Sequence, residues 1–164
     1  MPRITAQPLT RKAFEPYGDV IEIREDDRHF PINDGTTERF DDLATAIALG
    51  EEARVAISMA RAQPFQLPHF VHMVERHPEG SQAFIPVVPA RFLVIVSPDQ
   101  RGKPGNPEAF LAGPGQGINF FAGTWHGVLT TLDRQTDFII VDRKGVGENL
   151  KTFTFDEPWE VDID

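Results

Sequence analysis

Apolar residues in this chain recur mostly at every second position or in short runs rich in β-branched and aromatic residues. In residues 54–61, Val55, Ile57 and Met59 alternate with small or polar side chains. Period two is the spacing of a β-strand, because successive side chains point to opposite faces of a sheet. Runs of this kind predict strands at 19–23, 54–61, 69–77, 82–88, 91–96, 118–121, 125–132, 137–141 and 152–155.

Turn-forming residues separate most of these strands. Residues 78–80 (Pro-Glu-Gly) join two of them into a hairpin, and the glycine-rich stretch 113–117 precedes another. Many short strands at close spacing are typical of a β-sandwich or a β-barrel. Helical signals are weak: Thr10 is suited to cap a short helix that reaches Phe14, and residues 40–49 have some helical spacing. The pattern predicts an all-β domain that spans residues 1–164, with a few short helices.

Composition and charge narrow the classes of partner. The 164 residues include no cysteine, which excludes disulfides, thiol nucleophiles and thiolate metal ligands. A formal net charge of −9 repels phosphate backbones, so we expect no nucleic-acid partner. No apolar run approaches the roughly 18 residues that span a bilayer. We expect a cytoplasmic protein that binds a small molecule and associates with no membrane.

Polar side chains gather around the turn at residues 78–80. Glu75 and His77 are two positions apart, so they point to the same face of one strand. Gln82 begins the next strand of the hairpin, close to both. A carboxylate, an imidazole and an amide oxygen that converge inside a barrel can bind a divalent cation.

A second segment carries a motif of cupin barrels. Gly115 is followed by five residues, Phe121, one residue, Gly123, two residues and His126. Cupins use this spacing for their second motif, normally with proline where Phe121 stands. The glycines permit a tight turn, and the strand that follows delivers one histidine into the barrel.

The first cupin motif has two histidines spaced by one residue and then a glutamate. Glu75, His77 and Gln82 fall at those places, so the spacing is kept while the chemistry is altered. Alone, Glu75 and His77 would be a surface pair; the matching His126 segment favours a shared site. We therefore predict a cupin-type antiparallel β-barrel, or double-stranded β-helix, with a site inside it formed by Glu75, His77, Gln82 and His126. The other histidines are expected to be ordinary packed or surface residues: His29, His69 and His72.

Over nearly its whole length the sequence resembles the ureidoglycolate lyase family, formerly called ureidoglycolate hydrolase. The matching stretches are 8–22, His29 to Thr36, Glu75 to Pro86, Gly115 to Phe120, Trp125-His126 and Asp137 to Arg143. The chain also departs from the family. Where members usually read Trp-His-His-Pro-Leu, this chain has Gly127 and Val128 after His126, and it has Phe and Ala at 120–122 where Tyr and Arg are common.

The resemblance implies that the protein eliminates urea from ureidoglycolate to give glyoxylate, a step in allantoin and purine degradation. It implies that Glu75, His77, Gln82 and His126 are the catalytic groups. They would surround a divalent metal ion, with nickel as the metal that the resemblance suggests, or, without a metal, the substrate itself. Asn33 and Thr36 would close over the substrate, and Arg39 is a candidate partner for the substrate carboxylate. The resemblance also implies a homodimer.

Two alternatives to this reading stay open at the level of sequence. One is another metal-dependent cupin enzyme, such as an oxygenase or isomerase that acts on a small acid. The other is a non-catalytic cupin that binds a small ligand, because one fold serves many functions.

Overall fold

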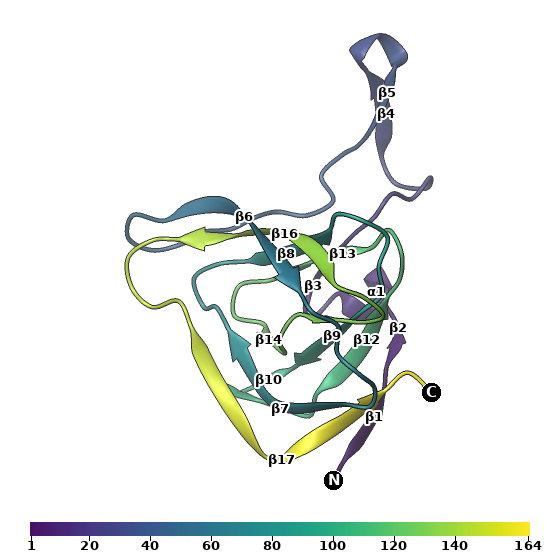
Figure 1. Cartoon of the computed structure of the whole chain (residues 1–164). Coiled ribbons are helices and arrows are strands. Elements are labelled where there is room, and N and C mark those ends of the chain that lie inside the picture. The colour runs from purple at the N-terminus through teal and green to yellow at the C-terminus, as the bar shows by residue number, and fades with distance from the viewer.

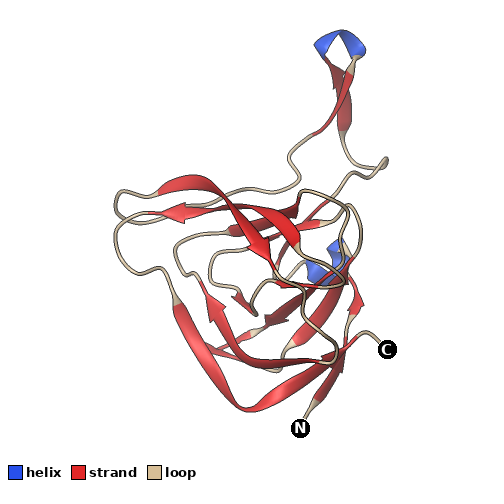
Figure 2. Ribbon diagram, in the orientation of Figure 1, coloured by secondary structure: helices blue, strands red, loops and turns tan.

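Two β-sheets and a protruding hairpin make up the molecule (Figures 1 and 2). The structure is a computed structural model that describes residues 1–164. The larger sheet has eight strands, in the order β1 (Arg3–Thr5), β17 (Lys151–Asp162), β7 (His69–Arg76), β14 (Trp125–His126), β9 (Phe92–Ser97), β12 (Glu108–Ala112) and β2 (Gln7–Pro8), with β15 (Thr130–Thr131) beside β9. The smaller sheet has five, in the order β3 (Gly18–Ile21), β13 (Gly117–Phe120), β8 (Gln82–Pro86), β16 (Thr136–Lys144) and β6 (Arg54–Ala62).

The remaining elements are short. One helix, α1 (Arg11–Phe14), covers part of the barrel, and β10 (Asp99–Gln100) pairs with β11 (Lys103–Pro104). The hairpin consists of β4 (His29–Ile32), the single turn η1 (Asn33–Gly35) and β5 (Thr37–Phe40), and is called the arm below. No helix of the structure is long and apolar enough to cross a membrane.

Strand β9 of the larger sheet contributes side chains to two hydrophobic cores. All six of its residues are buried. Phe92, Val94 and Val96 belong to the core that also contains residues of the smaller sheet, whereas Leu93 and Ile95 belong to a second core formed within the larger sheet. Alternate residues of a strand face opposite sides, so a continuous apolar run is required here.

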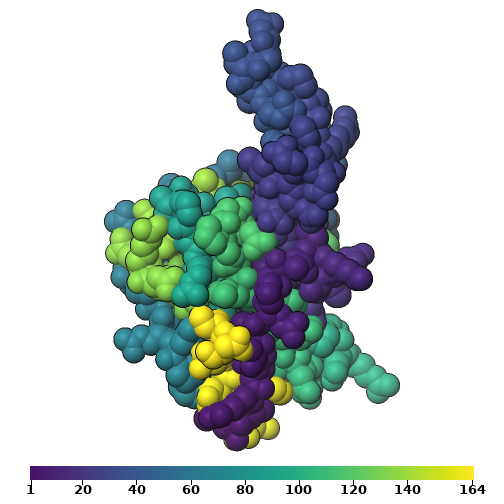
Figure 3. Space-filling model, turned by 90° about the vertical axis from the view of Figure 1, so that its right-hand side faces the viewer, coloured from purple at the N-terminus to yellow at the C-terminus, as the bar shows by residue number.

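The arm stands clear of the barrel (Figures 1 and 3). Its two strands form a separate two-stranded sheet and pair only with each other. The ring of His29 stacks on Phe40 with 4.8 Å between centroids, and His29 Nδ1 lies 2.6 Å from a carboxylate oxygen of Glu38.

The all-β prediction is confirmed, and each predicted strand has a counterpart in the structure. The segment 125–132 forms two short strands instead of one, and α1 begins after Thr10, whose hydroxyl accepts a hydrogen bond from Ala13 N at 3.2 Å. Residues 40–49 are not helical: β5 ends at Phe40, and Ala48 makes an isolated bridge to Gly80. The apolar pattern does not predict the pairing of β4 with β5 in the arm.

Candidate metal centre and active site

Three of the predicted site residues meet where β7 ends beside β14. Glu75 on β7 is the direct partner of His126 on β14, and His77 follows one residue after β7. The ligand atoms of Glu75, His77 and His126 all lie within 4.8 Å of one another. His77 Nε2 is 4.0 Å from Glu75 Oε1. A carboxylate and two imidazoles this close together could hold a metal ion.

Trp125 fixes the direction of His126. The Trp125 side chain is buried in the second core, and its Nε1 donates a hydrogen bond to Asp99 Oδ1 at 3.0 Å. The Arg76 guanidinium lies 4.5 Å from the centre of the indole ring, a cation–π distance. Neighbouring residues on a strand face opposite sides of the sheet. Because Trp125 is held in the second core, His126 points to the other side, into the barrel interior. Trp125 is therefore a core residue of the larger sheet.

The hydrogen bonds of the two histidines leave the same ring nitrogen free. His77 Nδ1 is 2.8 Å from the carbonyl oxygen of Asn149, and His126 Nδ1 is 2.9 Å from that of Gly127. A carbonyl only accepts, so each Nδ1 carries the proton and donates it. Both Nε2 atoms are then lone-pair acceptors, and both are buried without a hydrogen-bond partner. Buried polar atoms are normally paired, so these two fit the ligand positions of a metal ion.

Burial also sets the protonation state of His126. Its side chain is buried, with 2% of the residue exposed, and desolvation lowers its pKa to about 4. The nearby His77 lowers this pKa further, while the hydrogen bond to Gly127 opposes the shift. His126 is therefore neutral at neutral pH, which is the form that binds metals.

Gln82 lies on the inner face of the barrel next to this group. It pairs with Phe120 on one side and with Asp142 on the other. The Phe120 ring stacks on His126 at 4.3 Å between centroids, with an interplanar angle of 5°. Gln82 Nε2 donates to Asp142 Oδ2 at 3.1 Å, whereas Gln82 Oε1 is buried and unpaired. Asp142 thus holds the amide with its nitrogen turned away and its oxygen free for a ligand.

A small pocket opens beside His77. Its volume is about 200 Å³, and it is lined by His77, Ser81, Asp142, Arg143, Lys144, Asn149 and Leu150. Arg143 is not free to bind an anion there, because its Nε donates to the Leu49 carbonyl at 2.6 Å and its side chain pairs with Glu79 at 3.2 Å. Lys144 makes no ion pair within the chain, so it is the cation of this pocket that an acidic substrate could use.

The packing of Gly127 against Ile95 explains why this chain departs from the family pattern at position 127. A Cβ at this position would lie 3.0 Å from Ile95 Cβ, which is tighter than ordinary van der Waals contact. Gly127 N also donates to the Ile95 carbonyl at 2.9 Å. With Ile95 in place, glycine is the residue that fits without a shift of the strands.

The predicted substrate residues Asn33, Thr36 and Arg39 all lie on the arm. Thr36 Oγ1 donates to the Asn33 carbonyl at 2.8 Å, and Arg39 pairs with Asp41 at 2.8 Å. Since the arm projects away from the barrel (Figure 1), these residues do not join the Glu75 group within one chain.

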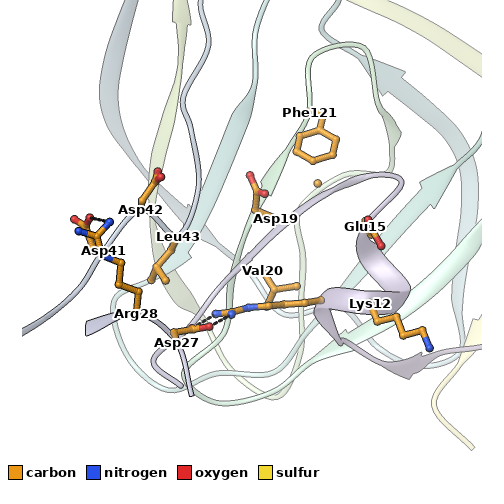
Figure 4. Close-up of a pocket in the computed structure, with 12 residues that line it drawn as sticks. Lys12, Glu15, Asp19, Val20, Asp27, Arg28, Asp41, Asp42, Leu43 and Phe121 are labelled. Atoms are coloured by element: carbon orange, nitrogen blue, oxygen red, sulfur yellow. Dashed lines mark hydrogen bonds and ion pairs between the residues drawn. The ribbon is translucent and has the colours of Figure 1, made fainter. Parts of the chain in front are cut away.

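A wider hollow lies at the base of the arm (Figure 4). Its volume is about 550 Å³, and its walls come from α1, β3 and residues 27–28 and 41–43, with Phe121 at one side. Arg11 closes part of it through a double ion pair with Asp27, one contact being 2.6 Å. Two ion pairs, Arg11 with Asp27 and Arg28 with Asp41, join charged groups of this hollow. It contains none of the residues with unpaired buried nitrogens.

Comparison with known proteins places the chain in a family. The sequence model of ureidoglycolate lyase matches residues 1–162. The chain belongs to the ureidoglycolate lyase family. Proteins named ureidoglycolate lyase from Chelativorans sp. and Mesorhizobium japonicum are 55% and 56% identical to it, each over 99% of this chain and over 98% and 99% of their own lengths. The chain is thus a carbon–nitrogen lyase by family.

A solved structure supports the fold alone. A dTDP sugar isomerase from Desulfovibrio desulfuricans G20 superimposes with a TM-score of 0.50 at 13% sequence identity, covering 86% of this chain and 87% of that one. This likeness agrees with the predicted cupin-type barrel.

Three residues of the site were not predicted from sequence, one of which is Lys144 in the pocket beside His77. Asp142 orients Gln82, and the Asn149 carbonyl orients His77. A signal for Asp142 exists: it has the strand parity of Phe138 and Ile140, so a carboxylate falls on the core face of β16. A backbone carbonyl in a loop, as at Asn149, leaves no such signal.

Proposed function

We propose that this chain eliminates urea from ureidoglycolate and releases glyoxylate, in the degradation of allantoin and so of purines. Family membership over residues 1–162 and relatives above 50% identity support this activity. The observation that carries the site assignment is the pair of unpaired, buried Nε2 atoms on His77 and His126, next to Glu75.

The proposed ligands of a divalent ion are Glu75 and Gln82 through oxygen and His77 and His126 through Nε2. Nickel is the proposed metal, from the family resemblance and because imidazole ligands suit it. When bound, such an ion would act as a Lewis acid that eases loss of the substrate hydroxyl proton. Four protein ligands would leave positions open for the substrate carboxylate and hydroxyl.

The reaction needs a proton removed from oxygen and a proton delivered to nitrogen. Ureidoglycolate carries a carboxylate, a hydroxyl and a ureido group on one carbon. Loss of the hydroxyl proton forms the carbonyl of glyoxylate while the carbon–nitrogen bond breaks, and protonation of the nitrogen gives urea. We assign the proton exchange to Glu75, the carboxylate at the centre, and the binding of the substrate carboxylate to Lys144 at the pocket mouth.

The test compares the wild-type protein with His126→Ala. Urea, ammonia and glyoxylate are measured together, and bound nickel is measured by elemental analysis. We expect urea and glyoxylate in equal amounts from the wild type, with no ammonia. His126→Ala should lose about a hundredfold or more in kcat/KM and most of its nickel, because loss of a ligand exceeds the roughly 10–100-fold cost of losing an outer-shell partner.

The matched control is His72→Ala, since His72 is exposed on β7. This variant should keep both activity and nickel. Ammonia in step with glyoxylate and without urea would contradict the lyase. Full activity in His126→Ala would leave the lyase standing and overturn the site.

We also propose that the protein works in the cytoplasm as a homodimer with a small-molecule substrate and no nucleic-acid or membrane partner. The family resemblance and the acidic charge of −9 support these assignments. Cell fractionation and light scattering test the first two.

A further inference from the structure

The strand that carries His126 has very little backbone pairing of its own. β14 consists of Trp125 and His126 alone. It has one residue pair with β7, His126 opposite Glu75, and two residue pairs with β9. The position of a strand in a sheet is set by its ladder of hydrogen bonds and by side-chain contacts across the strands. With so short a ladder, the spacing between His126 and Glu75 depends strongly on side chains.

Two side chains on the opposite face of β7 and β14 supply such contacts. Arg76 stands between Glu75 and His77 in the chain, so it points away from the barrel interior. Trp125 precedes His126 and points away for the same reason. The Arg76 guanidinium lies over the Trp125 ring, 4.5 Å from its centre. Behind the candidate metal centre, β7 and β14 are therefore in side-chain contact.

One carboxylate oxygen joins these two side chains. Asp99 Oδ1 accepts a hydrogen bond from Trp125 Nε1 at 3.0 Å and another from Arg76 Nη1 at 2.9 Å. Asp99 is also the one ion-pair partner of Arg76 within the chain. Hydrogen bonds to a charged group are stronger than those between neutral groups. The shared oxygen thus ties β7 to β14 on the face opposite the ligand atoms.

The hairpin of β10 and β11 holds the Asp99 carboxylate in place. Its two-residue turn consists of Arg101 and Gly102, both with positive φ, at 56° and 84°. Gly102 N donates to Asp99 Oδ2 at 3.1 Å. This hydrogen bond and that from Trp125 lower the pKa of Asp99, so its carboxylate is charged at neutral pH. Figure 1 shows β7, β10 and β14 at the same side of the barrel.

We propose that Asp99 is a positioning residue of the metal centre, which sets the spacing of His126 from Glu75 without touching metal or substrate. The ligand atoms of Glu75, His77 and His126 lie within 4.8 Å of one another. Metal–ligand distances tolerate only about 0.2 Å of variation, so a small shift of β14 against β7 weakens the site. The effect on metal binding rests on the proposed function, whereas the effect on strand pairing does not.

The first experiment titrates the metal-free protein with nickel. Asp99→Ala should bind nickel about tenfold more weakly than the wild type, at the low end of the cost of losing a partner outside the ligand shell. Asp99→Asn keeps an oxygen that can accept from Trp125 and Arg76, so it should lose clearly less affinity than Asp99→Ala. The comparison of the two variants separates the shared oxygen from the bulk of the side chain.

The matched control is Asp133→Ala. The side chains of Asp133 and Asp99 are 52% and 46% exposed, and Asp133 accepts two hydrogen bonds from Arg91, at 2.9 and 2.8 Å. This pair contacts neither β7 nor β14. Asp133 has a φ of 66°, which alanine adopts poorly, so its replacement also costs stability. Nickel affinity should nevertheless equal that of the wild type.

The second experiment measures amide hydrogen exchange in the metal-free protein. Gly123 N donates to the His77 carbonyl at 2.9 Å, so its exchange rate reports on the attachment of the β14 segment to the end of β7. Val87 N donates to the Asp137 carbonyl at 3.1 Å and reports on the smaller sheet. Asp99→Ala should raise the exchange rate of Gly123 about tenfold through local opening and leave that of Val87 unchanged.

The outcomes separate this proposal from the proposed function. Unchanged nickel affinity or unchanged Gly123 exchange in Asp99→Ala would overturn the positioning role. So would an equal loss of nickel affinity in Asp133→Ala, or a loss in Asp99→Asn as large as in Asp99→Ala. A wild type that binds no nickel, together with faster Gly123 exchange in Asp99→Ala, would count against the proposed metal centre and support the joining of β7 to β14 by Asp99.

Discussion

The barrel interior and the arm differ in the kind of side chain that lacks a partner: buried polar atoms in the barrel, and apolar side chains on the arm. Inside the barrel, the Nε2 atoms of His77 and His126 are buried without a partner, in surroundings that include the Phe120 ring. On the arm, polar groups are paired locally, as His29 is with Glu38, while its apolar side chains belong to neither core. Unpaired polar atoms inside a protein indicate a small ligand or an ion. A hairpin without an apolar core indicates a macromolecular partner.

The largest expected effect is on the free energy of unfolding, and it compares a core residue of the barrel with a residue of the arm. Phe138→Ala should lower the free energy of unfolding by about 3–5 kcal/mol, because Phe138 is fully buried and meets the Phe92 ring edge-on at 5.3 Å. Phe40→Ala on the arm loses mainly the stack on His29, worth about 0.5–1.5 kcal/mol.

Denaturation in guanidinium chloride measures both variants. If the arm packs on a second copy, the cost of Phe40→Ala should depend on protein concentration, whereas the cost of Phe138→Ala should not. Equal losses for the two variants at every concentration would contradict the distinction between core and arm.

The next effect concerns the orientation of Gln82. Asp142→Ala removes the acceptor of the Gln82 amide and frees the side chain to rotate, so kcat/KM and nickel affinity should each fall about 10–100-fold. Asp142→Asn keeps an acceptor oxygen in place and should stay within a few-fold of wild type by the same estimate.

This pair of variants separates positioning from proton transfer. If Asp142 carried a proton in the reaction, Asp142→Asn would lose as much activity as Asp142→Ala while binding nickel normally. Steady-state kinetics and nickel titration of both variants therefore decide the role of Asp142.

The barrel could be predicted from sequence because its signals are local. Period-two runs and the turns between them place most strands of both sheets, and strand parity places Glu75 and His77 on one face. The structure brings these two together with His126, and puts Gln82 on the neighbouring inner face. Short strands such as β1 and β2 were missed, because their pairing depends on distant residues and not on their own pattern.

The pairing of the arm, and which face of β6 points to the core, could not be predicted either, because both depend on residues distant in the sequence. Alternation in β6 shows that Val55, Ile57 and Met59 share a face but not which face is the core. In the structure that face points outward, and the small residues Ala56, Ser58 and Ala60 are the less exposed ones. The sequence pattern predicts no strand at β4 or β5, since the residues of β5 (Thr-Glu-Arg-Phe) carry no apolar alternation.

The smallest expected effect compares one histidine of the arm with one of the barrel. The hydrogen bond to Glu38 raises the pKa of His29 above its ordinary value, against a smaller lowering by burial. Burial lowers the pKa of His69 on β7, with a smaller contribution from His72. The His29–Glu38 pair therefore stabilises the arm fully below about pH 6.5, the pKa of an unfolded-state histidine, and this contribution is lost as pH rises through the folded pKa.

NMR titration of the ring protons should place the midpoints of His29 and His69 on opposite sides of about 6.5. Glu38→Gln should lower the midpoint of His29 and leave that of His69 unchanged, and amide exchange in β4 and β5 should then lose its pH dependence in this range. Identical His29 midpoints in wild type and Glu38→Gln would show that the ion pair does not form in solution, and that the polar groups of the arm are not paired locally as its contrast with the barrel requires.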